Sequence, residues 1–179
     1  MSYRPITDVW LLARSKTKYY GAFPAGFLSR ARDLLGVGVS DSVLHICGGK
    51  VRDYPFRGFG LNDKTLDLDP DCRPDFLQDC MDGLPVFGDA DIGWPAILID
   101  RPYTSEDADH YTPGAAKLPN INTLLKNSLA AVRLGGKVGI LDYMIPRPPK
   151  TARFTACIGV VVGFGNRGRF YTVFERGPQ

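Results

Sequence analysis

Apolar runs and polar turns alternate along the 179 residues of this chain. Two segments repeat apolar residues at helical spacing, and the pattern predicts helices over residues 26–35 and 122–134. Glycines follow both segments, and we expect Gly36 and the Gly135-Gly136 pair to end the helices. Short apolar runs predict strands in four further segments: 42–47, 64–69, 96–100 and 137–142.

The last part of the chain predicts a β-hairpin. Two β-rich runs, residues 154–164 and 169–174, flank the turn signal Gly165-Asn-Arg-Gly. Strands that alternate with helices or loops imply an α/β fold with a Rossmann-like, mostly parallel sheet, to which the hairpin adds an antiparallel end. The sequence shows no internal repeat and no boundary, so we expect residues 1–179 to form one domain.

Two intervening segments are less regular. Residues 74–80 are expected to be extended and to bring Asp79 to an edge of the sheet. Residues 101–120 are polar and contain proline, glycine and asparagine, which predicts a long loop of the kind that serves as a lid or is disordered. We expect His110 and Tyr111 to decorate this loop rather than act as an acid or a base.

Composition places the chain among globular proteins. With 44% hydrophobic and 23% charged residues, it is neither a disordered tail, a collagen-like fibre nor a disulfide scaffold. It has no run of apolar residues long enough for a membrane span and no signal-peptide core, so we expect a cytoplasmic protein. The cysteines lack Cys-x-x-Cys spacing and are expected to be free thiols: Cys47, Cys72, Cys80 and Cys157.

Charge is unevenly distributed although the net charge is only +3. Residues 1–40 carry six basic and two acidic residues, residues 41–110 six and fifteen, and residues 111–179 ten and two. Two interpretations stay open: ordinary solvated faces, or a fold whose basic ends converge on a polyanion. In the second, tyrosines 19, 20 and 143 would interleave with a phosphate track of basic residues: Arg14, Lys16, Lys18, Arg147, Lys150 and Arg153.

Chemically distinctive residues follow the predicted strands, at the edge where parallel sheets bind ligands. Gly48 and Gly49 follow the first strand and would let a ligand approach the backbone closely, and a plain turn is the alternative. Asp67 and Asp69 follow the second strand. A carboxylate there typically accepts both ribose hydroxyls of a nucleoside-containing cofactor, although Asp-x-Asp-Pro also suits a turn or a solvated strand end.

The most specific feature is the run of residues 97–103, Ile-Leu-Ile-Asp-Arg-Pro-Tyr. An apolar strand that ends in Asp100, a proline bend and Tyr103 puts a hydrogen-bond acceptor beside an aromatic ring. The carboxylate and a backbone carbonyl can accept both N–H hydrogens of an exocyclic amine while the base stacks on the ring. The run therefore predicts a site for a planar base that carries an amino group.

With these residues the chain resembles a class I S-adenosylmethionine-dependent methyltransferase, nearest the small amino-methylating DNA methyltransferases found in phage genomes. Leu44-His-Ile-Cys-Gly-Gly resembles the family's glycine-rich motif, Asp67 its acidic residue after the second strand, and residues 100–103 its Asp-Pro-Pro-Tyr motif. Residues 18–24 resemble a segment that closes over the methionine end of the cofactor. The resemblance spans roughly residues 14–175, and the order of the motifs is its main strength.

The resemblance implies S-adenosyl-L-methionine as cofactor and methyl transfer to an amino nitrogen, that of adenine in DNA ahead of RNA. It would place the protein in the cytoplasm, that of the host if a phage encodes it. It assigns cofactor binding to eight residues: Tyr20, His45, Cys47, Gly48, Gly49, Asp67, Asp79 and Cys80. It assigns catalysis to Asp100, Arg101, Pro102 and Tyr103.

Arg101 stands where the family has its first proline. It keeps the backbone carbonyl that the site requires, and its charged side chain can instead bind a phosphate at the substrate mouth. With the altered glycine motif, it also favours an alternative, a catalytically silent fold that acts as a binding or assembly module. A nicotinamide-dependent oxidoreductase is a third reading, although the full Gly-x-Gly-x-x-Gly is missing.

We expect no metal site, because the spacing of His45, Cys47 and the distant cysteines does not suit zinc. His45 is instead expected to be a hydrogen-bonded strand residue. The oligomeric state does not follow from the sequence.

Overall fold

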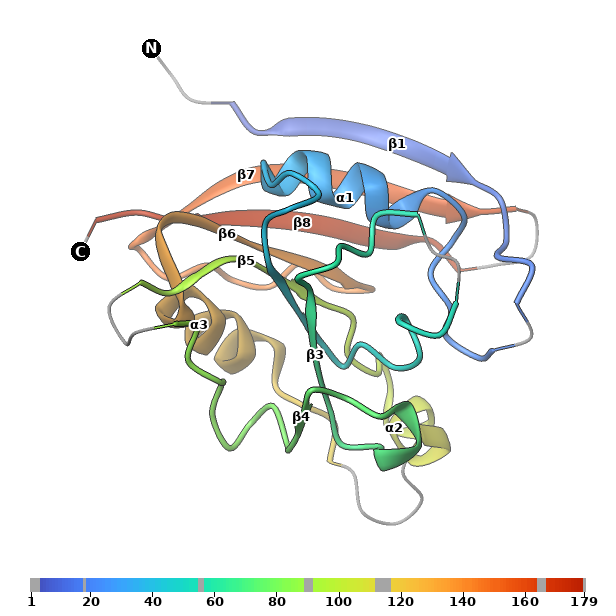
Figure 1. The fold of residues 1–179 in the computed structure, drawn as a ribbon. Coiled ribbons are helices and arrows are strands. Elements are labelled where there is room, and N and C mark those ends of the chain that lie inside the picture. Colours follow the sequence, from blue (N-terminus) through green and yellow to red (C-terminus); the bar gives the residue numbers. More distant parts are fainter. Residues whose placement is uncertain are drawn as a thin grey trace.

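The computed structural model describes residues 4–17, 19–54, 57–88, 92–111, 117–163 and 167–178. Lys18 of the expected track and Gly165 and Asn166 of the expected turn lie outside these residues. Within the described part, eight strands form one sheet in the order β1-β7-β8-β6-β5-β2-β3-β4 (Figure 1). The expected mixed, mostly parallel α/β sheet is confirmed.

One part of the sheet consists of parallel strands. The apolar runs predicted four of them: β2 (Val43–Ile46), β3 (Lys64–Asp67), β5 (Trp94–Ile99) and β6 (Val132–Asp142), of which β6 begins earlier than expected. The fifth, β4 (Phe76–Leu77), lies in the segment that was expected to be extended. All six side chains of β5 are buried, which explains its continuous apolar sequence. Because these strands are parallel, the residues that follow each of them lie along one edge of the sheet.

The other end of the sheet holds the expected hairpin and one strand that was not predicted. β7 (Ala152–Val162) and β8 (Arg169–Arg176) pair antiparallel, and β8 also pairs antiparallel with β6. β1 (Ile6–Leu12) lies parallel to β7, with Ile6 opposite Ala156. This pairing joins chain segments that are far apart in the sequence, and periodicity within residues 6–12 does not reveal it.

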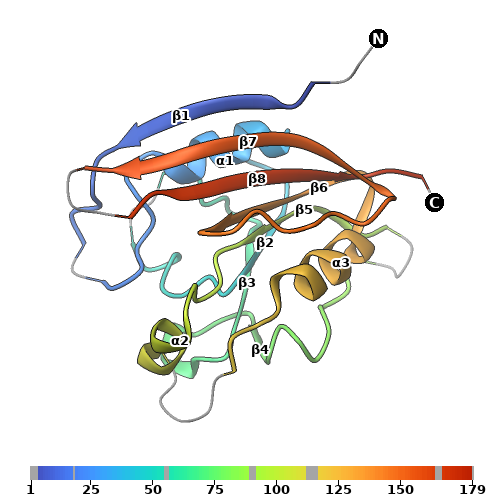
Figure 2. The same cartoon turned by 180° about the vertical axis from the view of Figure 1, so that it is seen from behind.

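Two helices cover opposite faces of the sheet (Figures 1 and 2). α1 (Phe27–Leu35) packs with Ala96 and Leu98 of β5 in one hydrophobic cluster. α3 (Ile121–Ala131) packs with Ile97 and Ile99 in the other. The alternation of side chains along β5 thus supplies both layers of the core. Among the described residues, no helix is long and apolar enough to cross a membrane.

The structure corrects two expectations about irregular segments. Residues 101–120 are not a loop throughout, because α2 (Ser105–Tyr111) lies within them. α3 ends at Ala131 and Val132 already belongs to β6, so Gly135 and Gly136 lie inside that strand rather than at the end of a helix. The first segment has a weak sequence signal, because α2 is polar and buries only Ala108.

Candidate functional site

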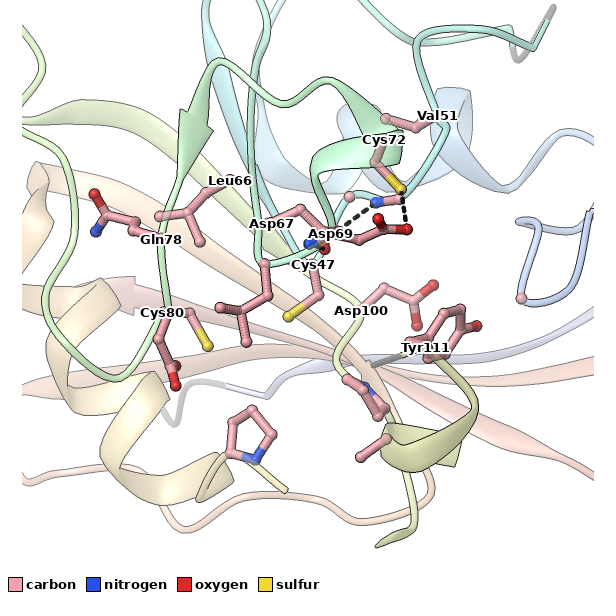
Figure 3. Close-up of a pocket in the computed structure, with 18 of the residues that line it drawn as sticks. Cys47, Val51, Leu66, Asp67, Asp69, Cys72, Gln78, Cys80, Asp100 and Tyr111 are labelled. Carbon is pink, nitrogen blue, oxygen red and sulfur yellow. Dashed lines mark hydrogen bonds between the residues drawn. The ribbon is translucent and has the colours of Figure 1, made fainter. Parts of the chain in front are cut away.

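The residues that follow β2, β3, β4 and β5 line one pocket (Figure 3). It encloses about 860 Å³ of space between atoms, open solvent at its mouth included. Nine residues singled out from the sequence contribute to it: Cys47, Gly48, Gly49, Asp67, Asp69, Asp79, Cys80, Asp100 and Pro102. Helix α2 and the segment of residues 19–23 supply further lining residues.

The turn after β2 is hydrogen-bonded to the end of β3. The Gly49 N–H donates to Asp67 Oδ2 at 2.8 Å, and the Asp69 N–H donates to Asp67 Oδ1 at 3.1 Å. Gly49 has a φ of 53°, and a Cβ there would lie 2.9 Å from the Tyr19 hydroxyl oxygen, so both its conformation and its neighbour favour glycine. Burial raises the pKa of Asp67, and the two N–H donors oppose that rise.

Asp69 belongs to a turn and also lies at the pocket, and ribose binding by it stays a prediction. It lines the pocket, and its side chain also caps the 3₁₀ turn Pro70–Cys72 by accepting the Asp71 N–H at 2.9 Å. Cys72 Sγ lies 3.3 Å from Asp69 Oδ2 and 3.8 Å from the Tyr19 hydroxyl. The predicted turn is therefore present at residues 70–72, and it positions Asp69 in the pocket lining.

Tyr19, rather than Tyr20, faces the pocket from the segment before α1. Burial raises the pKa of Tyr19. Tyr20 is 53% exposed, and its hydroxyl donates to Asp107 Oδ1 of α2 at 2.8 Å. The structure thus places the Tyr20 side chain on α2 and outside the pocket lining, and its role in cofactor binding stays a prediction.

Tyr111 of α2 packs on the same segment and lines the pocket, so it is not a mere decoration of a loop. A Cβ at Gly21 would lie 1.9 Å from the Tyr111 hydroxyl oxygen, and Gly21 has a φ of 76°. His110 points elsewhere and lies against Tyr20, with ring centroids 4.3 Å apart. α2 therefore fixes the segment of residues 19–23 over the pocket.

Asp79 and two cysteines line the wall beyond β4. Asp79 Oδ1 accepts the Met81 N–H at 2.8 Å, which orients the carboxylate. A hydrogen bond with Cys80, followed by burial, raises the pKa of the Cys47 thiol well above its ordinary value. Both cysteines are free thiols, and at neutral pH Cys47 is a protonated, apolar wall residue rather than a nucleophile.

Asp100 is hydrogen-bonded to the tyrosine that follows it. The Tyr103 hydroxyl donates to Asp100 Oδ1, and Arg169 Nη1 donates to the Tyr103 oxygen at 3.1 Å. Burial raises the pKa of Asp100 to about 6, with Arg169 and the Tyr103 hydrogen bond opposing the rise and Asp142 adding to it. The ring of Tyr103 is not a free stacking surface. It lies against Tyr143, with ring centroids 4.6 Å apart, and the Arg169 guanidinium lies 5.8 Å from its centroid.

Arg101 does not reach out toward a phosphate. Its side chain is 4% exposed and lies behind the pocket, with Nε 2.9 Å from Asp142 Oδ2 at the end of β6. Neither of these two atoms makes a well-aligned hydrogen bond with a described residue, so the contact is an ion pair of poor geometry. Burial raises the pKa of Asp142, and Arg101 only partly opposes this. A buried arginine thus lies at the position where the resemblance implied a proline.

His45 is the hydrogen-bonded strand residue that was expected. Its Nε2 lies 3.0 Å from Asp63 Oδ2, on the face of β2 that packs away from α3. Its side chain does not line the pocket, and the neighbouring glycine turn does. Among the described residues, no group of three or more His, Cys, Asp or Glu could hold a metal ion.

The expected phosphate track is divided by the fold. Arg14 and Lys16 follow β1 and are exposed at the same edge of the sheet as the pocket. Arg153 lies near the start of β7, at the opposite edge, where it pairs with Glu175 at 2.6 Å. Lys150 precedes β7 near that same edge. Arg153 and Lys150 therefore do not belong to one track with Arg14.

Sequence reasoning missed two charged residues behind the site. Asp142 had a signal, because it ends an apolar strand as Asp100 does. Arg169 had none, because only the antiparallel return of β8 brings the first residue of that strand beside Tyr103.

No family model matches this chain, and no curated protein matches it. Solved structures with a similar fold are numerous. TrmN from Thermus thermophilus superposes with a TM-score of 0.58 at 17% identity, over 86% of this chain and 49% of TrmN. An rRNA methylase from Streptococcus thermophilus gives 0.52 at 13% identity, over 88% of this chain and 100% of the methylase. SMU.1697c from Streptococcus mutans, solved in complex with SAH, gives 0.51 at 11% identity, over 82% and 95%.

The chain spans about half the length of TrmN. The superpositions establish the fold. At identities this low they show neither the substrate nor the activity of this chain. The shared architecture is a mostly parallel sheet with antiparallel strands contributed by the C-terminal part of the chain. The chain therefore has the Rossmann-like fold of class I methyltransferases.

Proposed function

We propose that this protein is an S-adenosylmethionine-dependent methyltransferase that acts on an amino nitrogen, with adenine in DNA ahead of adenine in RNA as the acceptor. One observation carries the proposal. A single pocket contains both the Gly49–Asp67 pair, which suits a nucleoside cofactor, and Asp100, which suits a target amine. Cofactor and acceptor would then meet at neighbouring strand ends.

The residues around Gly49 fit the cofactor. Each oxygen of Asp67 has accepted one backbone hydrogen bond and retains a second acceptor position for a ribose hydroxyl. Gly48 and Gly49 offer backbone without side chains, and Asp79 and Cys80 would contact the adenine from the β4 side. When bound, S-adenosylmethionine supplies a methyl group that its sulfonium has already activated.

The chain's own task would be to position the amine. Asp100 and the backbone carbonyl of Arg101 would accept its two N–H hydrogens and so aim the nitrogen lone pair at the methyl group. With a pKa of about 6, Asp100 is ionised at neutral pH and accepts such a hydrogen bond. It is also able to take up the proton that the nitrogen loses as it is methylated.

A second function has its own supporting observation. The Tyr103 hydroxyl already occupies one oxygen of Asp100, and the Arg101 side chain is held by Asp142. A methyltransferase-like fold that acts as a binding or assembly module needs neither a free Asp100 carboxylate nor a free Arg101 side chain, so both contacts are compatible with it. Methyl transfer to any acceptor separates the two functions.

The first test is a calorimetric titration with S-adenosylmethionine and S-adenosylhomocysteine, with NAD as a negative control. We expect both sulfur compounds to bind, and Asp67→Ala to abolish binding. Asp53→Ala is the matched control, because Asp53 pairs with Arg73 outside the pocket lining. Binding would justify measuring tritiated methyl uptake by DNA and RNA. Absence of binding by the wild type would refute the enzyme proposal and leave the binding module.

A further inference from the structure

Basic residues from both ends of the sequence lie at one end of the pocket edge: Arg14 and Lys16 after β1, and Arg167 and Arg169 at the start of β8. β1 and β7 both end at this edge, and β8 begins there. Both views place the segment that follows β1 beside the end of β7 and the start of β8 (Figures 1 and 2). The acidic middle of the chain supplies the other end of the edge, with Asp67, Asp69 and Asp79. Strand order thus brings four basic residues to one end of the pocket edge and three aspartates to the other.

A tyrosine lies near Asp100, because it packs against Tyr103, whose hydroxyl donates to Asp100. Tyr143 follows β6 and packs against Tyr103 at 4.6 Å between ring centroids. The Arg167 guanidinium lies 5.9 Å from the Tyr143 ring, and that of Arg169 lies 5.8 Å from the Tyr103 ring. Arg167 is exposed and also attracts the exposed Glu106, an interaction that is weak in water and that a phosphate can replace.

Two apolar side chains continue this surface into solvent. Met144 is 58% exposed and Ile145 is 49% exposed, directly after Tyr143. They follow a strand whose last five residues are all buried, so the chain passes from the core to an apolar exposed turn at the pocket edge. Apolar and aromatic surface next to arginine is what an unpaired base with its phosphate contacts.

We propose that Tyr143, Met144, Ile145 and Arg167 form a platform that binds a nucleotide next to the target base in single-stranded nucleic acid. One side of the Tyr143 ring already contacts Tyr103, so the base would take the place of the exposed Arg167 guanidinium on that ring, next to the two apolar side chains. Arg167 would then pair with the phosphate of the same nucleotide. This inference rests on the proposed function, because it assumes that the target amine reaches Asp100. A paired base presents no free ring face to such a platform, which is why the inference specifies an unpaired strand.

The test measures binding of fluorescein-labelled 12-mers by fluorescence anisotropy, as single-stranded DNA, single-stranded RNA and duplex DNA. Tyr143→Ala should weaken single-strand binding roughly 5- to 150-fold, whereas Tyr143→Phe should retain it. Arg167→Ala should lower the slope of log affinity against log salt by about 0.7. Arg133→Ala is the matched control, because Arg133 is exposed near the start of β6, at the opposite edge of the sheet.

Binding of S-adenosylhomocysteine to each variant shows whether its pocket is intact. If duplex DNA binds as tightly as the single strands, or if Tyr143→Ala and Arg133→Ala behave alike, the platform is refuted even when methyl transfer occurs. If the platform variants lose single-strand binding but no nucleic acid accepts a methyl group, the platform stands as a binding surface and the proposed enzyme activity fails.

Discussion

Two buried arginine–aspartate pairs in this protein differ sharply in how well their charges are matched. Arg32 of α1 pairs with Asp63 ahead of β3, where neither residue lines the pocket. Arg101 pairs with Asp142 directly behind Asp100. Both arginines and both carboxylates are almost inaccessible to solvent. The surroundings of the pairs, rather than their burial, therefore account for the difference.

The Arg32 pair is saturated with hydrogen bonds. Asp63 accepts backbone N–H groups of Val43 at 3.0 Å and Gly60 at 2.8 Å, in addition to bonds with Arg32 and His45. Arg32 also donates to backbone carbonyls of three residues: Gly38, Asp41 and Gly58. Burial alone would raise the pKa of Asp63, but His45 and Arg32 outweigh it and bring the pKa down to about 2.

The Arg101 pair is left partly unmatched. Arg101 Nε and Asp142 Oδ2 make no well-aligned hydrogen bond within the described structure, and the pKa values of Asp142 and Asp100 are both raised. A fold that saturates one buried pair could have saturated the other. Buried polar atoms without hydrogen bonds are often found at functional sites. We therefore expect the first pair to serve folding and the second to serve the proposed site.

Removing Asp63 should have the largest effect. Asp63→Ala leaves Arg32 buried without its counter-charge, and we expect the free energy of unfolding to fall by about 3–5 kcal/mol in urea denaturation. Asp53→Ala breaks the exposed pair with Arg73 and should cost less than about 1 kcal/mol. Equal costs for the two variants would contradict the structural role of the first pair.

Removing Arg101 should cost less, about 2–3 kcal/mol, because the Asp142 carboxyl can take up a proton in place of its partner. Arg101→Met in an Asp142→Asn background should recover most of the loss. Arg101→Pro in the same background introduces the proline of the Asp-Pro-Pro-Tyr motif that residues 100–103 resemble, and under the proposed function methyl transfer should rise. A double variant no more stable than Arg101→Met would show that the pair is not coupled.

Most of the fold and of the pocket could be predicted from the sequence. Strands β2 and β5, helix α1 and the closing hairpin follow from local periodicity, since one face or both faces of each are buried. The clustering of Asp67, Asp79 and Asp100 follows from one rule, that parallel strands end at the same edge. Local pattern and this single rule therefore sufficed for most of the pocket.

Features that depend on which strands are neighbours could not be predicted in the same way. The Arg101–Asp142 contact requires that β5 and β6 be adjacent, and the Arg169 contact requires the return of β8. β1 finds its partner in β7, at the far end of the chain. α2 buries a single alanine, so its sequence resembles a loop. The failures at β1, at the Arg101–Asp142 contact and at Arg169 share one cause, because local sequence does not show which strands pair over long range.

Neutralising Asp100 should stabilise the protein while abolishing methyl transfer. The pKa of Asp100 rises from 3.8 to about 6 on folding, so wild-type stability falls as pH rises through this range. Asp100→Asn cannot ionise, and we expect it to be more stable by about 3 kcal/mol above pH 7 and nearly equal to the wild type at pH 4. Urea denaturation at both pH values measures the difference, with Asp53→Asn as the control. A gain that is the same at both pH values would mean that desolvation of the carboxylate is not its cause.

The smallest effect concerns the hydrogen bond between Tyr103 and Asp100. Tyr103→Phe removes the hydroxyl that stabilises the ionised carboxylate, and Arg169 loses its partner at 3.1 Å. We expect the pKa of Asp100 to rise above about 6 by less than one unit, equivalent to about 1 kcal/mol. Carboxyl ¹³C NMR titration of wild type and variant, assigned with Asp100→Asn, measures the shift. An unchanged or lower pKa would show that Arg169 alone sets the charge of Asp100. Arg169 would then lower the pKa of Asp100 as Arg32 lowers that of Asp63, and the two regions would differ less in how their carboxylates are stabilised.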